Sequence, residues 1–136
     1  MAIRILIMGL PGSGKTTLAK ELVPKLNAIW FNADEVRQQF NDWDFSKKGR
    51  LRQARRMRNL SDMSLAKYVV VDFVAPLQEM RDIFDAQYVI WVDTIKAGRF
   101  KNTNLTFSPP LCYNVRINTQ DAEYWSNIIV KDILNG

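Results

Sequence analysis

The residues with the clearest chemical purpose form the run Gly9-Leu10-Pro11-Gly12-Ser13-Gly14-Lys15-Thr16, which fits the phosphate-binding pattern GxxxxGK[ST]. Glycines let consecutive backbone N–H groups curve around a polyphosphate, and a helix N-terminus behind them adds a favourable dipole. In this pattern the lysine reaches the β- and γ-phosphates, and the hydroxyl group after it binds Mg²⁺. We therefore expect a nucleoside triphosphate to be bound by Gly9, Gly12, Ser13, Gly14, Lys15, Thr16 and Thr17, with Lys15 also catalytic and Thr16 on the metal.

The flanking sequence supplies the elements that such a loop requires. Residues 3–8 are apolar and predict a buried strand, and residues 17–23 predict the helix. Further strand patterns at 28–31, 68–74, 88–92 and 112–117 alternate with helical patterns at 34–40, 46–65, 77–84 and 121–134, with Ser46 as an N-cap. This alternation predicts an α/β protein, a three-layer P-loop NTPase or kinase fold with a mostly parallel five-stranded sheet. Ligands of such sheets bind at the carboxyl ends of the strands.

Composition limits the remaining possibilities. The 136 residues are 47% hydrophobic and 24% charged, which is typical of one globular domain, and the net charge of +5 suits anionic ligands. A single cysteine, Cys112, and no histidine exclude a disulfide framework and a His/Cys metal cluster. No apolar run is long enough for a signal peptide or a membrane span. We expect a cytoplasmic protein, one domain over residues 1–136, without a membrane partner.

An acid follows the second predicted strand, at the sheet edge where the phosphate loop also lies. Asp34 is placed there to accept a proton from an attacking hydroxyl or to hold Mg²⁺ through water. Arg37, three residues later, shares a helical face with Asp34 and could bind an anionic acceptor. The alternative is that Asp34 only caps a helix. Beside a phosphate loop we favour the catalytic role.

The next predicted helix is strongly basic. Runs of charge usually form solvated faces, but arginine also suits bidentate binding of phosphate or sulfate, and a nucleic-acid backbone would explain the same cluster. The residue types alone leave these interpretations open. The cations are Lys47, Lys48, Arg50, Arg52, Arg55, Arg56 and Arg58.

Five segments in order resemble the motifs of adenylylsulfate (APS) kinases. GLPGSGKTTLA, NADEVR, FSKKGRLRQARR, FVAP and WVDT correspond to GxSGxGKST, DGDNVR, FSxxDRxxNIRR, FISP and FVDT of that family, over residues 5–95. The resemblance implies ATP and Mg²⁺ as cofactors and phosphate transfer to the 3′-hydroxyl of adenylylsulfate. The chain would then be a phosphotransferase with an alcohol group as acceptor, acting in sulfate assimilation.

The resemblance also implies which residues bind the acceptor. Asp34 and Arg37 match the acid and arginine of DGDNVR, and Arg50 matches the arginine of FSxxDR. Gln53 stands where the family has an acceptor-contacting asparagine. Phe45, or alternatively Phe73, would imitate the family's aromatic residue that stacks on the acceptor adenine.

The chain departs from this pattern in several places. Asn32, Ala33 and Glu35 replace the Asp, Gly and Asn of DGDN, and Ala75 replaces the serine of FISP. The family's basic lid helix is reduced to a lid-like loop at about residues 94–111. In that loop Lys96, Arg99 and Lys101 either replace the lid cations or are simply exposed.

A second family offers an alternative. The stretch from Phe31 to Arg37 is also similar to the NRDDxR stretch of phage-type polynucleotide 5′-kinases, which Asn32 fits better than it fits DGDNVR. The alternatives are therefore a polynucleotide or nucleoside kinase, with nucleic acid as partner, and a nucleotide-binding module without catalysis. Retention of Lys15, Thr16 and Asp34 argues against the last. A homodimer is left open.

Two further acids and the tryptophans complete the candidates. Asp72 ends a run of valines at the position of a Walker B aspartate, and we include it as a metal residue with Thr16. Asp93 is expected to anchor a turn or the lid-like loop. Trp30, Trp91 and Trp125 are interpreted as packing, whereas Trp43 lies in a polar segment where an exposed indole could stack on a base.

Overall fold

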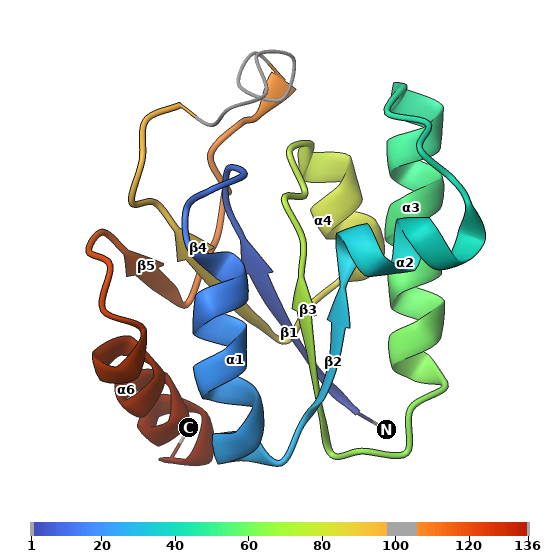
Figure 1. The fold of residues 1–136 in the computed structure, drawn as a ribbon. Coiled ribbons are helices and arrows are strands. Elements are labelled where there is room, and N and C mark those ends of the chain that lie inside the picture. The colour runs from blue at the N-terminus through green and yellow to red at the C-terminus, as the bar shows by residue number, and fades with distance from the viewer. Residues whose placement is uncertain (1, 98–105, 136) are drawn as a thin grey trace.

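The computed structural model describes residues 2–97 and 106–135, and its strands form one parallel sheet in the order β2-β3-β1-β4-β5. Figure 1 shows α1 and α6 on one face of this sheet and α3 and α4 on the other. The three-layer α/β fold predicted from the sequence is therefore confirmed, and each strand pair in the described chain is parallel.

The helices and strands follow the predicted alternation, and most ends shift by one to three residues. The predicted helix 46–65 ends earlier, at Asp62, although Ser46 is its N-cap as expected, because its hydroxyl accepts from the Gly49 N–H. The last strand is shorter than predicted. In chain order the elements are β1 (Ile3–Met8), α1 (Lys15–Leu26), β2 (Ile29–Asn32), α2 (Ala33–Phe40), α3 (Lys47–Asp62), β3 (Tyr68–Asp72), α4 (Gln78–Phe84), β4 (Tyr88–Val92), β5 (Val115–Ile117) and α6 (Ala122–Asn135).

The sheet separates two hydrophobic cores. Side chains alternate along a strand, so Ile5 and Ile7 of β1 pack under α1 and α6, whereas Leu6 and Met8 pack under α3 and α4. β3 alternates in the same way and is buried throughout. Because both faces are covered, the central strands are continuous apolar runs, as parallel sheets require.

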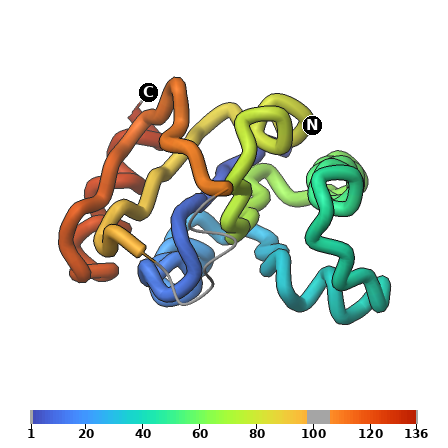
Figure 2. Tube along the Cα trace, turned by 90° about the horizontal axis from the view of Figure 1, so that it is seen from above, coloured from blue at the N-terminus to red at the C-terminus, as the bar shows by residue number. Residues whose placement is uncertain are grey.

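The carboxyl ends of β1, β2 and β3 meet at one edge of the sheet, at the top of Figure 1. The register places Ile7 beside Asp72 and Asp72 beside Asn32. The phosphate loop leaves β1 at this edge, α2 begins at it, and Figure 2 looks down onto it.

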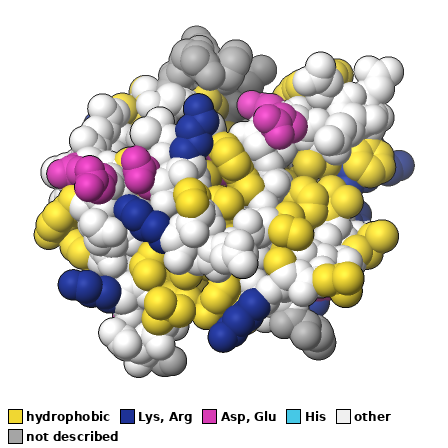
Figure 3. All heavy atoms as spheres, turned by 60° about the horizontal axis from the view of Figure 1, so that its bottom comes forward, with side chains coloured by type: hydrophobic (Ala, Val, Ile, Leu, Met, Phe, Trp, Pro, Cys, Tyr) yellow, Lys and Arg dark blue, Asp and Glu magenta, His cyan; other side chains and the backbone are white. Residues whose placement is uncertain are grey.

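The opposite end of the molecule has a different surface. Figure 3 shows hydrophobic side chains gathered there between scattered basic ones. Exposed hydrophobic residues near the amino ends of the strands include Ile29, at the start of β2, and Met63 and Leu65, between α3 and β3. No helix in the described part of the chain is long and apolar enough to cross a membrane.

Candidate active site

The phosphate loop joins β1 to α1 in a conformation that its glycines permit. Gly9 has φ +153°, and a Cβ atom there would lie 2.4 Å from the backbone oxygen of Val92. Gly14, the N-cap of α1, has φ +107°, a backbone conformation that other residues rarely adopt. The Thr94 hydroxyl donates to the Ser13 carbonyl at 2.6 Å, which ties the loop to the end of β4. The backbone N–H groups at the start of α1 are thereby available to an anion.

Lys15 lies within this loop. Its side chain is 8% exposed, and its Nζ donates to the carbonyl oxygen of Leu10 at 3.0 Å. The amine thus bonds across the loop that a polyphosphate would occupy, and a bound phosphate could replace this carbonyl as acceptor.

The hydroxyl group of Thr16 belongs to a junction between the first turn of α1 and the ends of β2 and β3. Thr16 Oγ1 donates to Asp72 Oδ2 at 3.0 Å, and Asn32 Nδ2 donates to the same oxygen at 2.8 Å. Asp72 is 3% exposed, so its carboxylate depends on these two donors. Asn32 also caps α2, because its Oδ1 accepts from the Glu35 N–H at 3.0 Å. One amide therefore connects the start of α2 to the carboxylate beside the phosphate loop.

Thr16 and Asp72 suit Mg²⁺ because both offer oxygen atoms. Among the described residues no group of three or more His, Cys, Asp or Glu side chains could hold a metal by themselves. Mg²⁺ is usually bound by one or two protein groups together with substrate phosphates and water, so one carboxylate and one hydroxyl next to a phosphate loop fit it.

Asp34 and Arg37 lie on α2, directly after this junction. Asp34 is exposed in the first turn, and its carboxylate has no hydrogen-bond partner among the described residues. Arg37 is 4% exposed, and its Nη1 donates to the Asp42 carbonyl at 2.9 Å and to that of Asp44 at 3.3 Å. Burial lowers the pKa of Arg37, while the nearby charge of Asp42 opposes that change. Arg37 thus holds the chain between α2 and α3, and Asp34 is the residue open to an acceptor.

The α2–α3 loop, residues 41–46, is held mainly by ion pairs with α3. Asp42 accepts from Arg52 Nε at 2.8 Å and from Arg56 Nη2 at 3.0 Å, and Asp44 accepts from Arg52 Nη2 at 3.2 Å. Hydrogen bonds from Arg52 and Arg56 hold the pKa of Asp42 well below its usual range. A Cβ atom on Gly49 would lie 2.2 Å from the Asp44 carbonyl, so glycine lets the loop pack this closely on α3.

These contacts change the interpretation of the basic helix. Arg58 pairs with Asp62, and Lys47 pairs with Glu79. With Arg52 and Arg56 bound to the loop, only Lys48 and Arg55 of the helix cations have no partner among the described residues. Most of the run serves the protein's own structure, which weakens the case for a nucleic-acid surface here.

Arg50 differs from its neighbours on α3. It is 7% exposed, and its Nε donates to the Phe45 carbonyl at 2.8 Å. Its Nη1 is buried with no hydrogen-bond partner in the described part of the chain. Burial lowers the pKa of Arg50, and no carboxylate offsets that effect. A buried guanidinium without a carboxylate is a candidate anion site.

The aromatic and amide candidates are placed differently from one another. Phe73 is 4% exposed within the core under α3 and α4, so the expectation that it could stack on an acceptor is wrong. Phe45 is 53% exposed, lies over the Arg37 guanidinium and is close to the exposed Trp43. Gln53 is fully buried and donates to the Ala33 carbonyl, so in this structure it stabilises the first residue of α2 from within the core.

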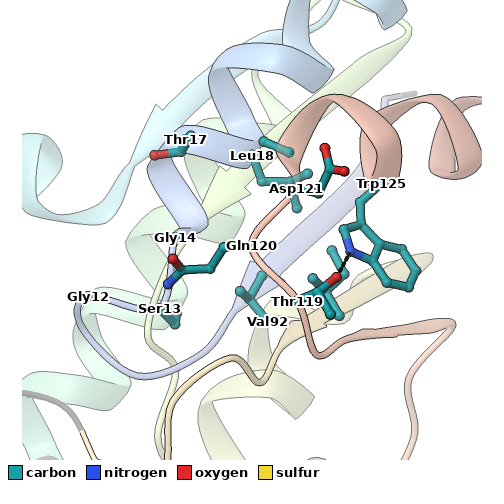
Figure 4. Close-up of a pocket in the computed structure, with 12 residues that line it drawn as sticks. Gly12, Ser13, Gly14, Thr17, Leu18, Val92, Thr119, Gln120, Asp121 and Trp125 are labelled. Carbon is teal, nitrogen blue, oxygen red and sulfur yellow. Dashed lines mark hydrogen bonds between the residues drawn. The ribbon is translucent and has the colours of Figure 1, made fainter.

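A cavity of about 280 Å³ lies beside the phosphate loop, on the side of β4, β5 and α6. Gly12, Ser13 and Gly14 form one wall, and residues 119–122 and Trp125 form another (Figure 4). The Trp125 indole N–H donates to the Thr119 hydroxyl at 2.9 Å, which fixes the ring at the cavity. Trp125 packs against the core under α1 and α6, as expected, and it also forms part of the wall of this cavity.

The lid-like loop is described at its two ends. Lys96 is exposed, whereas Arg99 and Lys101 lie outside the described residues. Asp93 accepts from Arg116 at 2.6 Å, and so joins the ends of β4 and β5. This contact links two neighbouring strands, so the prediction that Asp93 anchors a turn or the lid-like loop stays a prediction.

Comparison with known proteins shows what this arrangement resembles. Residues 5–121 match a family model described as an AAA domain. No curated protein sequence matches the chain.

Several solved structures with a similar fold are kinases, and another is Kti12 from Chaetomium thermophilum in complex with ADP-AlF3. An APS kinase from Mycobacterium tuberculosis, in complex with AMPPNP and APS, has a TM-score of 0.80 at 20% identity, over 99% of this chain and 98% of that chain. A shikimate kinase from Acinetobacter baumannii in complex with shikimate has a TM-score of 0.66 at 16% sequence identity, over 99% of this chain and 94% of that chain. A gluconokinase from Sinorhizobium meliloti 1021 has a TM-score of 0.68 at 14% identity, over 99% of this chain and 98% of that chain. At these identities the matches show the fold, which is that of P-loop kinases.

The hydrogen bond between Asn32 and Asp72 can be tested by measuring the stability of a variant. Asn32→Asp keeps an acceptor for the α2 cap but places a second carboxylate against Asp72 in place of a donor. We expect a loss of about 1–3 kcal/mol and a melting temperature lower by several degrees, measured without nucleotide.

Exchanging the two groups supplies the control. Asn32→Asp combined with Asp72→Asn restores one amide and one carboxylate, so it should recover most of the lost melting temperature. A single variant as stable as wild type, or a double variant whose loss equals the sum of the two single losses, would contradict the assigned contact.

Proposed function

The chain belongs to the AAA domain family, and from that premise we propose that it transfers the γ-phosphoryl group of ATP to a hydroxyl group of a small anionic acceptor. The observation that carries this proposal is the junction of Thr16, Asp72 and Asn32, from which α2 leads to the exposed Asp34. It supports the proposal because phosphate-loop, metal-side and acceptor-side groups start from one point on the sheet edge.

In this proposal the nucleotide and the acceptor bind on opposite sides of the phosphate loop. The cavity beside Trp125 has the size and aromatic wall for the nucleotide base, on the side of β4, β5 and α6. A triphosphate extending from it along Gly12 to Thr16 would end near Asp72 and α2. The acceptor then approaches from the side of Asp34, Arg50 and the α2–α3 loop.

The residues of the chain divide the reaction between them. Backbone N–H groups from Gly12 to Thr16 hold the phosphates, and Lys15 moves from the Leu10 carbonyl onto the β- and γ-phosphates. Asp34 orients the acceptor hydroxyl and takes its proton as the oxygen bonds to the γ-phosphorus and the bond to the β–γ bridging oxygen breaks. Mg²⁺, held by Thr16 and Asp72, would offset charge on the phosphate oxygens.

Adenylylsulfate is the acceptor that we favour. Arg50 offers a buried guanidinium to a phosphate or sulfate group, and Phe45 is exposed next to it for an adenine ring. The FSxxxRxxxxRR spacing and the likeness to an APS kinase with bound APS agree with this choice. Shikimate and gluconate, the substrates of the other similar kinases, are also anionic alcohols.

The experiment that tests this function is Mg²⁺-ATP turnover against a panel of acceptors: adenylylsulfate, shikimate, gluconate, a 5′-hydroxyl oligonucleotide and nucleosides, with ATP alone as control. We expect transfer to adenylylsulfate well above the ATP control. Transfer to another small anion would change the acceptor but keep the reaction. Transfer only to the oligonucleotide would support the polynucleotide kinase, and nucleotide binding without any transfer would contradict a kinase.

Arg50 allows a sharper test of the acceptor site. Arg50→Met should raise the KM of the acceptor by about tenfold or more, because it removes a charged hydrogen bond to the anion. The affinity for ADP should stay within about threefold of wild type.

Arg55→Met, on the exposed side of the same helix, is the matched control and should change neither quantity. An unchanged acceptor KM in Arg50→Met would show that the anion binds elsewhere.

A further inference from the structure

Arg81 is a buried arginine that the proposed reaction does not use. It lies on α4, is 7% exposed, and has no carboxylate within ion-pair distance among the described residues. Burial lowers its pKa to about 10, so it remains charged at neutral pH. Burying a charge without a carboxylate is costly unless carbonyl dipoles replace water around it.

The carbonyls that surround Arg81 come from two segments far apart in the sequence. Its Nε donates to the Ala75 carbonyl at 2.9 Å, and its Nη2 donates to the carbonyls of Pro76, at 3.2 Å, and Ser108. The Ser108 N–H donates to the Pro76 carbonyl at 3.0 Å, and the Phe107 ring lies 5.3 Å from the guanidinium. Arg81 thus holds residues 107–108 against the β3–α4 turn, residues 73–77. Figure 2 shows the course of the chain at this edge from above.

Both segments lie at the carboxyl edge of the sheet. The β3–α4 turn starts directly after Asp72, and its Ala75 is fully buried with φ +47°, a strained conformation for a residue other than glycine. Residues 107–108 belong to the connection that begins at Thr94, whose hydroxyl bonds to the phosphate loop. Arg81 therefore holds residues 107–108 of this connection, while the Thr94 hydroxyl holds the start of the connection against the phosphate loop.

We propose that Arg81 is a positioning residue for the acceptor, which it serves by locking the β3–α4 turn to residues 107–108 at a fixed separation. The proposal rests on the proposed function, since the acceptor side is defined by it. The guanidinium touches neither substrate. Its removal leaves two segments free to move apart, and displacements of about 1 Å in such positions reduce phosphoryl transfer strongly.

The chain contains a second buried arginine for comparison in Arg4, which differs from Arg81 in pairing with the carboxylates of Asp62 and Asp85. This arginine is also buried, 3% exposed, and donates to the carbonyls of Phe84 and Asp85 at the other end of α4. It lies near the start of β1, at the edge of the sheet away from the phosphate loop. Losing either arginine should destabilise the fold, but only Arg81 holds segments at the carboxyl edge of the sheet, where the acceptor is proposed to bind.

The test compares Arg81→Met, Arg81→Lys and Arg4→Met in the full chain, with the acceptor identified by the panel. Arg81→Met should raise the acceptor KM by about tenfold or more while the ADP affinity stays within about threefold. Arg81→Lys, which retains the charge but not the forked donors, should recover part of the loss. Arg4→Met should lower the melting temperature and leave the acceptor KM unchanged. An unchanged KM in Arg81→Met, or an equal rise in Arg4→Met, would overturn the proposal.

Hydrogen exchange of the ADP-bound protein separates this proposal from the proposed function. The Ser108 amide should lose protection in Arg81→Met and keep it in Arg4→Met. Protection retained in Arg81→Met would show that Arg81 does not hold residues 107–108 against the β3–α4 turn. If Arg81→Met loses this protection but the wild type phosphorylates no acceptor, the proposed function is refuted. The structural role of Arg81 in holding residues 107–108 would then still stand.

Discussion

The hydrogen bonds that Asp72 accepts from Thr16 and Asn32 are the contacts on which the rest of the site depends. They bring together the first turn of α1, the end of β3 and the end of β2, in a buried place where a carboxylate without donors would be costly. Asn32 suits its position because an amide can donate to Asp72 and also accept from the N-terminus of α2. The phosphate side and the acceptor side are therefore connected by one side chain.

Arginine side chains stabilise several of the loops around this junction. Arg37, Arg52 and Arg56 hold the α2–α3 loop, and Arg81 holds the β3–α4 turn, in each case by bonding to backbone carbonyls or to carboxylates of the chain itself. A strongly basic sequence thus leaves few cations free on α3. Arg50 differs from the other cations of α3 because one of its nitrogens is buried and has no partner among the described residues.

Local sequence was sufficient to predict the elements and the phosphate loop, because alternation, apolar runs and the glycine pattern are local signals. It could not show that Arg52 and Arg56 bind Asp42, or that Phe73 is buried, because both follow from how α3 packs on the sheet. The packing of Trp125 against the core was predicted, but its place beside the phosphate loop was not, because that depends on how the chain returns through β5 and α6. Asp72 was found from its place at the end of a valine run, and Asn32 gained its meaning only from the register of β2 and β3.

The most direct test of this account is the Mg²⁺ dependence of ADP affinity, measured by calorimetry for wild type and Asp72→Asn. If Thr16 and Asp72 form the metal side of the site, Mg²⁺ should tighten ADP binding by wild type by about tenfold or more, and Asp72→Asn should lose most of that gain. Without Mg²⁺ the two proteins should bind ADP within about threefold of each other. An equal gain from Mg²⁺ in both proteins would contradict the role given to Asp72, and with it the junction on which the proposed phosphoryl transfer depends.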